Sequence, residues 1–181
     1  MLGRGLASDV NGAYPRNDGS VGQLPMKEGT PLYNIYNTDA AWGAQWNLSQ
    51  LWILAYPEYM SEYISSHLQA YKDAGWLADG LANNRYVSGV GTNLLSTIIA
   101  SAYECGIRDF DTKIAYEACL KNELEGKNRP FGAGKVNTTE FVKYGYVPHQ
   151  DAGEGYHETF MFSASHTLEY SYSAWAVAQL G

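Results

Sequence analysis

The densest group of side chains able to do chemistry lies in a Gly-rich loop, HQDAGEGYHETF, at residues 149–160. Imidazole and carboxylate groups are common ligands of metal ions. The loop supplies five of them: His149, Asp151, Glu154, His157 and Glu158. Their spacing matches no known ligand pattern, and charged groups in a Gly-rich surface loop are usually solvated. We therefore predict no metal site in this loop.

Oxygen-bearing side chains near the start of the chain invite a calcium interpretation. Asp9, Asn11 and Asp18 could supply oxygen ligands, but the D-x-N-G pattern lacks the further acids of a calcium loop. Asp and Asn beside Gly more often stabilise turns, and we predict that role here.

His67 falls on an apolar helical stripe and is expected to be a core histidine with one hydrogen bond. The Ser and Cys residues show no nucleophile-elbow spacing.

Cys105 and Cys119 are the two cysteines of the chain. If Cys105 ends one helix and Cys119 lies about eight residues into the next, they are offset by about 12 Å along the axis. A disulfide needs Cα atoms within roughly 7 Å. We predict that both are small buried apolar residues. No histidine stands at ligand spacing from them, so zinc is not indicated.

The composition is that of a globular chain with one core: 181 residues, 45% hydrophobic, with a net charge of −7. The 12 basic residues are scattered, which argues against a nucleic-acid partner.

No apolar run approaches the roughly 20 residues of a membrane span. The first ten residues lack the apolar core of a signal peptide. Together the 15 tyrosines and 5 tryptophans outnumber the 5 phenylalanines, and such rings suit sugars as well as the wet end of a helical barrel.

Residues 1–37 are predicted to form a loop-rich lead-in, because Gly, Pro, Asn and Asp are dense there. The triplet Asn17-Asp18-Gly19 is a strong turn signal, and a short hairpin is expected.

Apolar residues recur with helical spacing over the remainder, 38–181. The pattern predicts helices over 38–56, 57–75, 92–105, 111–126, 137–145 and 165–181. Pro57 ends one helix and suits the first turn of the next, and Gly75 is a C-cap residue. Asp111 is a predicted N-cap, and Asn137 with Glu140 resembles a capping box. No alternating run long enough for a sheet follows residue 38. The predicted fold class is all-α, with antiparallel αα-hairpins.

Several short motifs occur in an order that resembles glycoside hydrolase family 92, the calcium-dependent exo-α-mannosidases. The matching segments are Asp9-Val10-Asn11-Gly12 with Tyr14 and Asp18-Gly19, Tyr56-Pro57-Glu58, Gly75-Trp76-Leu77, Ala102-Tyr103, Gly106-Ile107-Arg108, Phe110-Asp111, Ala115-Tyr116-Glu117-Ala118, Gly145-Tyr146-Val147-Pro148 and Ser165 through Gln179. They correspond to the start of the family's helical catalytic domain. The resemblance implies part of an (α/α)6 barrel.

The chain also departs from the family pattern. The family's first barrel helix carries S-L-W-D-T-Y-R, where this chain keeps the Trp as Trp42 but has Gly43 for Asp and Trp46 for Arg. Other acidic or histidine positions are replaced by Asn93 or Leu94, Ser101, Ser173 and Ala174. Later motifs that resemble EGNAWQYTW and GNDDGG, which carry the family's acid and base and most calcium ligands, do not occur. These departures suggest a divergent or non-catalytic branch and a chain that is a fragment of a longer protein.

Three residues in the matched segments are candidates for sugar binding. Trp42 is either a stacking platform or a core residue. Trp46 is a second candidate, with packing as its alternative. Glu169 could face the barrel interior or could be a partly buried carboxylate that supports the start of a helix. No catalytic pair of carboxylates is identified, so the chain by itself is predicted not to hydrolyse glycosides.

The resemblance implies that the parent is a secreted or periplasmic glycosidase acting on α-mannosides by inversion, with calcium held by residues outside this chain. The alternative is a non-catalytic helical module that binds glycans or supports a partner. Another (α/α)6 carbohydrate enzyme, such as a trehalase-like one, is a third hypothesis. Half a barrel would expose apolar helix faces, so either self-association or contact with the missing part of the barrel is expected.

Overall fold

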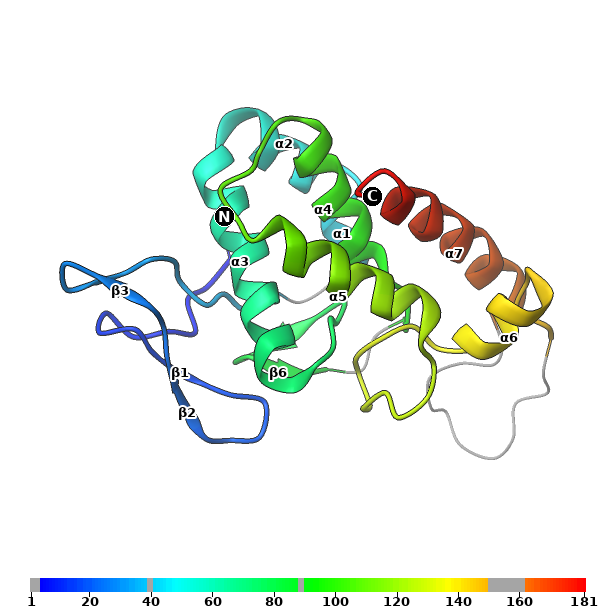
Figure 1. Cartoon of the computed structure of the whole chain (residues 1–181), viewed down its shortest axis with the longest axis horizontal. Helices are drawn as coiled ribbons and strands as arrows, with labels where there is room; N and C mark the ends of the chain where they lie inside the picture. Colours follow the sequence, from blue (N-terminus) through cyan, green and yellow to red (C-terminus); the bar gives the residue numbers. More distant parts are fainter. Residues whose placement is uncertain (1–3, 39–40, 88–89, 150–161) are drawn as a thin grey trace.

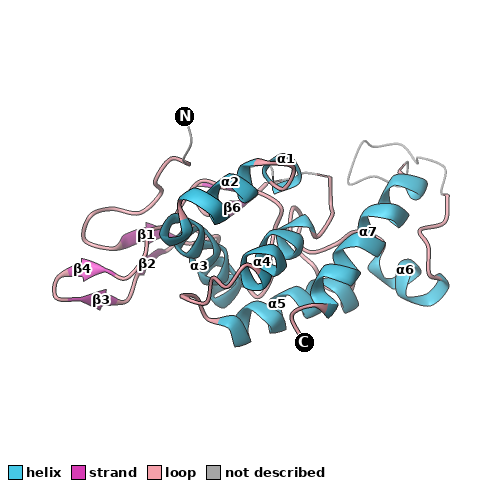
Figure 2. Cartoon of the chain, turned by 90° about the horizontal axis from the view of Figure 1, so that it is seen from above, coloured by secondary structure: helices cyan, strands magenta, loops and turns pink. Residues whose placement is uncertain are grey.

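The computed structural model describes residues 4–38, 41–87, 90–149 and 162–181, and it is mainly helical (Figures 1 and 2). The helices are α1 (Ala41–Ala44), α2 (Leu48–Ala55), α3 (Pro57–Ala74), α4 (Leu94–Glu104), α5 (Thr112–Leu124), α6 (Thr138–Tyr144) and α7 (Ser163–Ala178). The short strands are β1 (Ala13–Pro15), β2 (Val21–Gln23), β3 (Met26–Lys27), β4 (Thr30–Pro31), β5 (Leu81–Ala82) and β6 (Arg85–Tyr86). The all-α prediction is confirmed.

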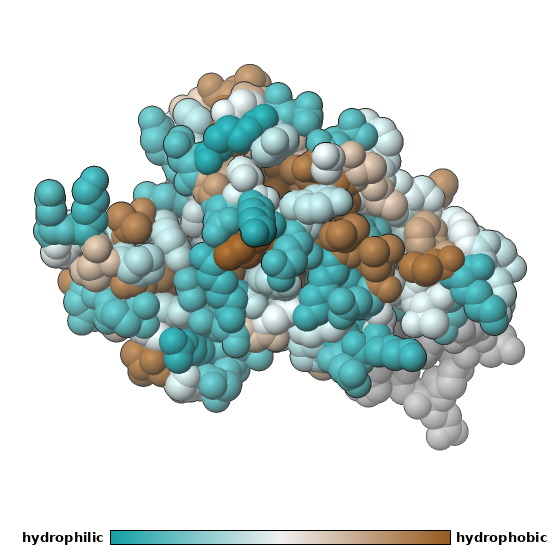
Figure 3. All heavy atoms as spheres, viewed as in Figure 1, coloured by the Kyte–Doolittle hydropathy of each residue, from teal (hydrophilic) through white to brown (hydrophobic). Residues whose placement is uncertain are grey.

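The helices form two layers around one main core. Helix α4 packs against α1 and α7, while α3 packs against α2 and α5, and α5 also packs against α7. Between the layers lie apolar side chains from six helices, among them Ala41, Trp52, Ile64, Ile98, Ala118 and Val177. Strands β1–β4 lie at one end of the molecule and α6 and α7 at the other (Figures 1 and 2). Apolar patches interrupt the otherwise hydrophilic surface of this view (Figure 3).

The helix ends follow the predicted signals in most places. Pro57 occupies the first turn of α3, and Gly75 closes that helix in the left-handed conformation at φ 80°. Asp111 caps α5 by accepting a hydrogen bond from the backbone N–H of Ile114. The predicted capping box is wrong: Asn137 has φ 51°, and its side chain makes no cap hydrogen bond to α6.

The predicted helix over 38–56 is broken into α1 and α2 by a turn at Gln45–Asn47. The carbonyl of Gln45 accepts a hydrogen bond from the side chain of Gln50 at 2.9 Å. The hydroxyl of Ser49 lies 3.5 Å from the same carbonyl oxygen. These side chains occupy an acceptor that a continuous helix would use in its backbone ladder, which accounts for the break.

The lead-in contains two small hairpins, so the expectation of a hairpin there is confirmed. Strand β1 pairs antiparallel with β2, and β3 with β4. Asp18 accepts hydrogen bonds from the backbone and hydroxyl of Ser20 in the turn between β1 and β2. Tyr14, Leu24 and Ile35 form a separate small core.

A third hairpin, β5–β6, was not predicted. Asn83 and Asn84 form its turn with φ of 49° and 58°. Asparagine tolerates this left-handed conformation, and two such residues make the mirror-image turn that suits a tight hairpin. With two residues in each strand, this hairpin is shorter than the alternating run that would predict a sheet after residue 38.

The cysteines are both free thiols, as predicted. Cys119 is buried, and burial raises the pKa of its thiol to about 12. Cys105 is exposed at the C-terminal end of α4, so the prediction that it is buried is wrong.

Candidate functional site

A cleft of about 280 Å³ lies at the N-terminal ends of α4 and α7, beside α1. Its lining comes from α1 and the turn after it, from the segment that leads into α4, and from the first turns of α7, with residues Trp42, Gln45, Trp46, Val90, Thr92, Leu94, Phe162, Ser165, His166 and Glu169. All three sugar-binding candidates, Trp42, Trp46 and Glu169, are among them. The fold thus brings together residues that lie far apart in the sequence. We call this the aromatic cleft.

The two tryptophans of the aromatic cleft differ in exposure. Trp42 on α1 is half-buried, while Trp46 in the turn before α2 is 73% exposed. An indole with that exposure does not pack in the core that the described residues form. The break between α1 and α2 is what leaves this ring at the surface. Both indoles can therefore offer a face or an edge to a ligand.

Glu169 lies on α7, well inside the helix that begins at Ser163, and it is half-buried. Its carboxylate makes no hydrogen bond or ion pair within the described residues. A carboxylate that supported the helix start would bond to the first backbone N–H groups. The carboxylate of Glu169 is thus available to accept hydrogen bonds from a ligand. Among the described residues that line the aromatic cleft, it is the one acidic group.

The wall of the aromatic cleft beneath these groups is formed by His166, which is 3% exposed. Its ring stacks on Tyr170 at 5.2 Å between centroids, and Phe162 meets it edge-on at 5.8 Å. Its Nε2 lies 2.9 Å from the carbonyl oxygen of Val90. Burial lowers the pKa of His166 from its ordinary value. The ring is accordingly neutral and held in one orientation.

Two residues that line the aromatic cleft, His166 and Gln45, were not among the candidates from the sequence. A signal for His166 was present, because residues three apart on a helix share a face and Glu169 follows it by three. Gln45 is buried, and its Oε1 accepts a hydrogen bond from the hydroxyl of Thr97 at 3.1 Å. That contact joins the turn after α1 to α4, and no local pattern in the sequence predicts it.

Two of the motifs singled out in the sequence meet at α7. The backbone N–H of Val147, in the segment Gly145-Tyr146-Val147-Pro148, donates to the hydroxyl of Thr167 at 2.9 Å. That hydroxyl in turn donates to the carbonyl of Ser163 at 2.7 Å. The motif therefore anchors the first turns of the helix that carries His166 and Glu169.

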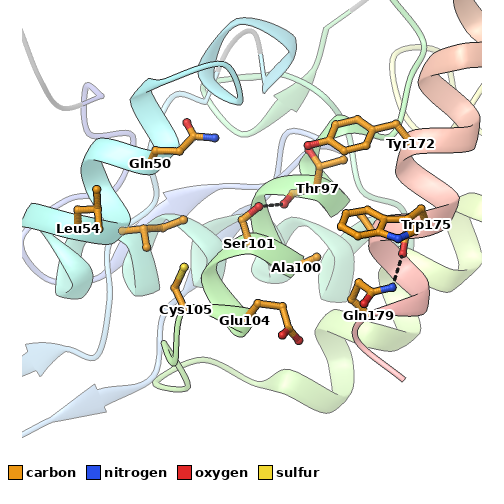
Figure 4. A pocket seen from close by; sticks show the side chains of 12 residues that line it. Gln50, Leu54, Thr97, Ala100, Ser101, Glu104, Cys105, Tyr172, Trp175 and Gln179 are labelled. Carbon is orange, nitrogen blue, oxygen red and sulfur yellow. Dashed lines mark hydrogen bonds between the residues drawn. The ribbon is translucent and has the colours of Figure 1, made fainter.

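A second hollow, of about 370 Å³, continues toward the C-terminal ends of α4 and α7. We call it the apolar groove. Leu54 of α2, Ala100 of α4 and the rings of Tyr172 and Trp175 on α7 line it (Figure 4). The two rings stack at 6.3 Å between centroids, and Trp175 is 61% exposed. Helices α2, α4 and α7 thus border an open hollow with a mainly apolar lining.

Residues proposed for calcium do not form a site. Asp9 and Asn11 accept hydrogen bonds from backbone N–H groups of Val10 and Ala13, as Asp18 does from Ser20. Their role in turns is thereby confirmed. Among the residues that the structure describes, no cluster of three metal-ligating side chains occurs. The loop residues Asp151, Glu154, His157 and Glu158 lie outside the described ranges, and His149 is at their edge.

The prediction of one hydrogen bond for His67 is wrong, since neither ring nitrogen has a partner in the described part of the chain. The ring is buried and meets Tyr63 edge-on at 4.9 Å between centroids.

No helix within the described ranges has the length and apolar character needed to cross a bilayer.

Comparisons with known proteins agree on one family. The model of the glycosyl hydrolase family 92 catalytic domain matches residues 1–181. A protein of Arthroderma benhamiae named as an uncharacterized secreted glycosidase is 34% identical over 139 residues, which are 72% of this chain and 17% of that protein. The chain therefore spans about a sixth of the length of this curated relative.

Solved structures show the same fold. A family 92 inverting mannosidase of Bacteroides thetaiotaomicron matches with a TM-score of 0.72 and 21% identity, over 93% of this chain and 22% of that one. An α-mannosidase of the same organism and family, solved with mannoimidazole, matches with a TM-score of 0.72 and 20% identity, over 97% of this chain and 20% of that one. Because the family model matches this chain from residue 1 to residue 181, the chain belongs to glycoside hydrolase family 92 and is part of its catalytic domain.

Proposed function

We propose that this chain forms one wall of the sugar pocket in a longer family 92 glycosidase that removes terminal α-mannosides. The observation that carries the proposal is the aromatic cleft, where Trp42, Trp46 and Glu169 come together from separate elements. The solved relatives are titled mannosidases, which gives the substrate class.

The chemistry of the aromatic cleft suits a monosaccharide. An indole packs against the C–H face of a sugar ring, and its N–H bonds a hydroxyl at the edge. The Glu169 carboxylate accepts one or two sugar hydroxyls, each worth about 1.5–3 kcal/mol because the acceptor is charged. Small pockets of a few hundred Å³ with a few convergent polar groups are typical of ligand sites.

The chain alone does not complete a hydrolytic site. Inversion needs two carboxyl groups roughly 6.5–9.5 Å apart on opposite faces of the sugar. The described lining supplies one, Glu169. We infer that the acid and base, like the calcium ligands that the family implies, belong to other parts of the protein. The described residues do not fit a calcium site, so no step is assigned to that ion.

The apolar groove supports the same picture of an incomplete domain. Leu54 is 83% exposed and Trp175 61% exposed on the face shared by α2, α4 and α7. The matched solved chains are about four to five times as long as this one. We propose that further helices of the same domain cover this face in the whole protein, and that the isolated chain self-associates through it. Secretion or a periplasmic location of the whole protein is proposed from the name of the fungal relative.

Titration of the ¹⁵N-labelled chain with methyl α-D-mannopyranoside tests the proposal. The indole N–H signals of Trp42 and Trp46 should shift saturably, while that of Trp175 in the apolar groove should stay in place. Half a pocket binds weakly, so dissociation constants in the millimolar range are expected. Trp42→Ala and Glu169→Gln should weaken binding, and the exposed-site variant Leu124→Ala should not. Unchanged indole signals, or shifts centred on Trp175, would reject the proposal.

A non-catalytic glycan-binding module is the second candidate, and one observation favours it. Glu169 is the one carboxylate among the described lining residues, whereas Gly43 and Ser101 stand where the family has acids. The coding sequence downstream of this chain distinguishes the enzyme from the binding module. Downstream acidic motifs and release of mannose from an aryl α-mannoside by the whole protein would support the enzyme. Their absence, with sugar binding retained, would support the module.

A further inference from the structure

The aromatic cleft carries a negative charge that the described residues do not neutralise. Glu169 lines the cleft, is half-buried and makes no hydrogen bond or ion pair within the described ranges. Its carboxylate oxygens are not among the side-chain atoms that burial closes to solvent. No Lys or Arg lines the cleft in the part of the chain that the structure describes. A positively charged ligand in the cleft therefore meets this carboxylate without competition from a protein cation.

His166, the titratable neighbour of Glu169 on the cleft wall, does not offset that charge. It is 3% exposed, and its Nε2 lies 2.9 Å from the carbonyl oxygen of Val90. Burial lowers the pKa of His166, so the imidazole is neutral at pH 7. A neutral ring neither repels a bound cation nor neutralises the carboxylate.

The helix ends that border the cleft do not reverse its charge either. The carboxyl oxygens of Asp79 accept hydrogen bonds from the backbone N–H groups of Thr92 at 3.0 Å and Leu94 at 3.1 Å, so the donors at the start of α4 are already used. The N-terminus of α7, like that of any helix, amounts to about half a positive charge. Glu169 places a full negative charge in the second turn of the same helix. The balance at the cleft is negative.

Aromatic rings surround the same space. Trp42 lies on α1, Trp46, 73% exposed, lies in the turn after it, and Phe162, 40% exposed, directly precedes α7. The face of an aromatic ring attracts a cation that lies within about 6 Å of its centre, and tryptophan is the best ring for this contact. Cages of such rings recognise quaternary ammonium groups. The aromatic cleft thus combines the rings of an ammonium site with a counter-charge.

We propose that the aromatic cleft is a binding site for small organic ammonium ions, with the charge held between the indoles of Trp42 and Trp46 and the carboxylate of Glu169. Its volume of about 280 Å³ is at the small end of ligand pockets, which suits a small molecule. Free amines and amine-bearing sugars share this chemistry. The proposal stands on the charge and the rings of the cleft, and it goes beyond the proposed function, which concerns neutral mannosides.

Two ring compounds of similar shape isolate the effect of the charge. Cyclohexylammonium chloride and cyclohexanol differ in one substituent, and each is titrated into the ¹⁵N-labelled chain at pH 7 while the indole N–H signals are followed. The signals of Trp42 and Trp46 should give a dissociation constant at least about fivefold lower for the ammonium ion than for the alcohol. Equal constants would overturn the proposal, as would a response to the ammonium ion that is centred on Trp175 of the apolar groove.

Substitutions test the charge and one of the rings separately. Glu169→Gln keeps the size of the side chain and should reduce the preference for the ammonium ion about threefold or more. Trp46→Leu, at an exposed position, should weaken binding of the ammonium ion more than that of the alcohol. Urea unfolding checks that both variants keep the fold.

A charge-matched control excludes general attraction to an acidic protein. Glu125→Gln lowers the net negative charge by the same amount as Glu169→Gln, at an exposed position that does not line the cleft. It should leave the preference for the ammonium ion unchanged. A preference that survives in Glu169→Gln, or that falls equally in Glu125→Gln, would contradict the assignment of Glu169.

A sugar pair distinguishes the two sources of the ammonium group. D-Mannosamine, at a pH below the pKa of its amine, is compared with D-mannose by the same indole signals. Tighter binding of D-mannosamine supports an amine-bearing sugar as the ligand. A preference confined to cyclohexylammonium supports a free amine.

The failure of this proposal is distinguishable from that of the proposed function. If methyl α-D-mannopyranoside shifts the signals of Trp42 and Trp46 while the ammonium ion binds no better than the alcohol, the sugar pocket stands and the ammonium site is wrong. If the ammonium ion shifts them and the mannoside does not, the ammonium site stands and the sugar pocket is wrong.

Discussion

The Nζ of Lys135 lies 2.5 Å from Oε2 of Glu123, and the two side chains are only 0% and 5% exposed. Asn93 donates to the other carboxylate oxygen at 2.7 Å. The same ammonium lies 4.6 Å from the ring centroid of Tyr170, the residue on which His166 stacks. A buried ion pair thus connects α4, α5 and α7 directly behind the aromatic cleft.

Breaking this ion pair should destabilise the chain strongly. Glu123→Gln leaves the Lys135 ammonium buried without its counter-charge, and the expected loss is about 3–5 kcal/mol of unfolding free energy. The double variant Glu123→Leu, Lys135→Met removes both charges and should recover most of that loss. Urea unfolding measures both. Glu125→Gln, at an exposed position on the same segment, is the control and should change stability little. A single variant as stable as the control would contradict the prediction.

The buried His67 should make the chain less stable in acid. Burial lowers the pKa of this histidine from 6.5 to about 3 in the folded state. Between those values the unfolded chain binds a proton that the folded chain does not, so stability falls as the pH drops below 6.5. From pH 7 to pH 5 the expected contribution is a loss of about 2 kcal/mol.

His67→Leu should remove this part of the pH dependence. Neither ring nitrogen of His67 has a hydrogen-bond partner in the described residues, so an apolar replacement leaves no polar group stranded. Urea unfolding at pH 7 and pH 5 compares the two chains. Leu124→Ala, at an exposed position without a titratable group, should keep the original slope. If His67→Leu loses as much stability in acid as the unaltered chain, the histidine is not the cause.

Asp79 caps α4 from a distance, and its removal should destabilise that helix. Its carboxylate accepts from the backbone N–H groups of Thr92 at 3.0 Å and Leu94 at 3.1 Å, and from the hydroxyl of Thr92. Asp79→Ala leaves these buried donors unpaired and should cost about 2 kcal/mol or more. The solvent-exposed cap variant Asp111→Ala should cost about 1 kcal/mol, because water replaces the lost acceptor. Equal losses in urea unfolding would show that the burial of Asp79 is unimportant.

The apolar groove should drive association of the isolated chain. Light scattering at increasing protein concentration should show dimers or larger species, and a hydrophobic dye should bind. Replacing Leu54 and Trp175 by Gln removes two exposed apolar side chains from this face and should reduce both signals. Leu124→Gln, at an apolar side chain that is 58% exposed outside the groove, is the matched control. A monomer that does not bind the dye would contradict the prediction that the apolar groove drives association.

Local rules in the sequence determined where most helices begin and end. Pro57, Gly75, Asp111 and Gly145 act on backbone groups within a few residues, so their effect is the same wherever the helix packs. The order of short motifs likewise identified the family, because motif spacing along the chain is a property of the sequence alone. The three sugar-binding candidates came from those motifs.

The tertiary structure decided what the local rules could not. The cap of α4 comes from Asp79 rather than from adjacent Asn93, and Lys135 is buried because Glu123 reaches it. These contacts join segments across loops, and their free energy depends on burial that no short window of sequence reveals. The same holds for the aromatic cleft, where the break at Gln45–Asn47 exposes Trp46 and the packing of α7 brings His166 and Glu169 beside it. Sequence patterns set the backbone of each element, and packing set which side chains meet.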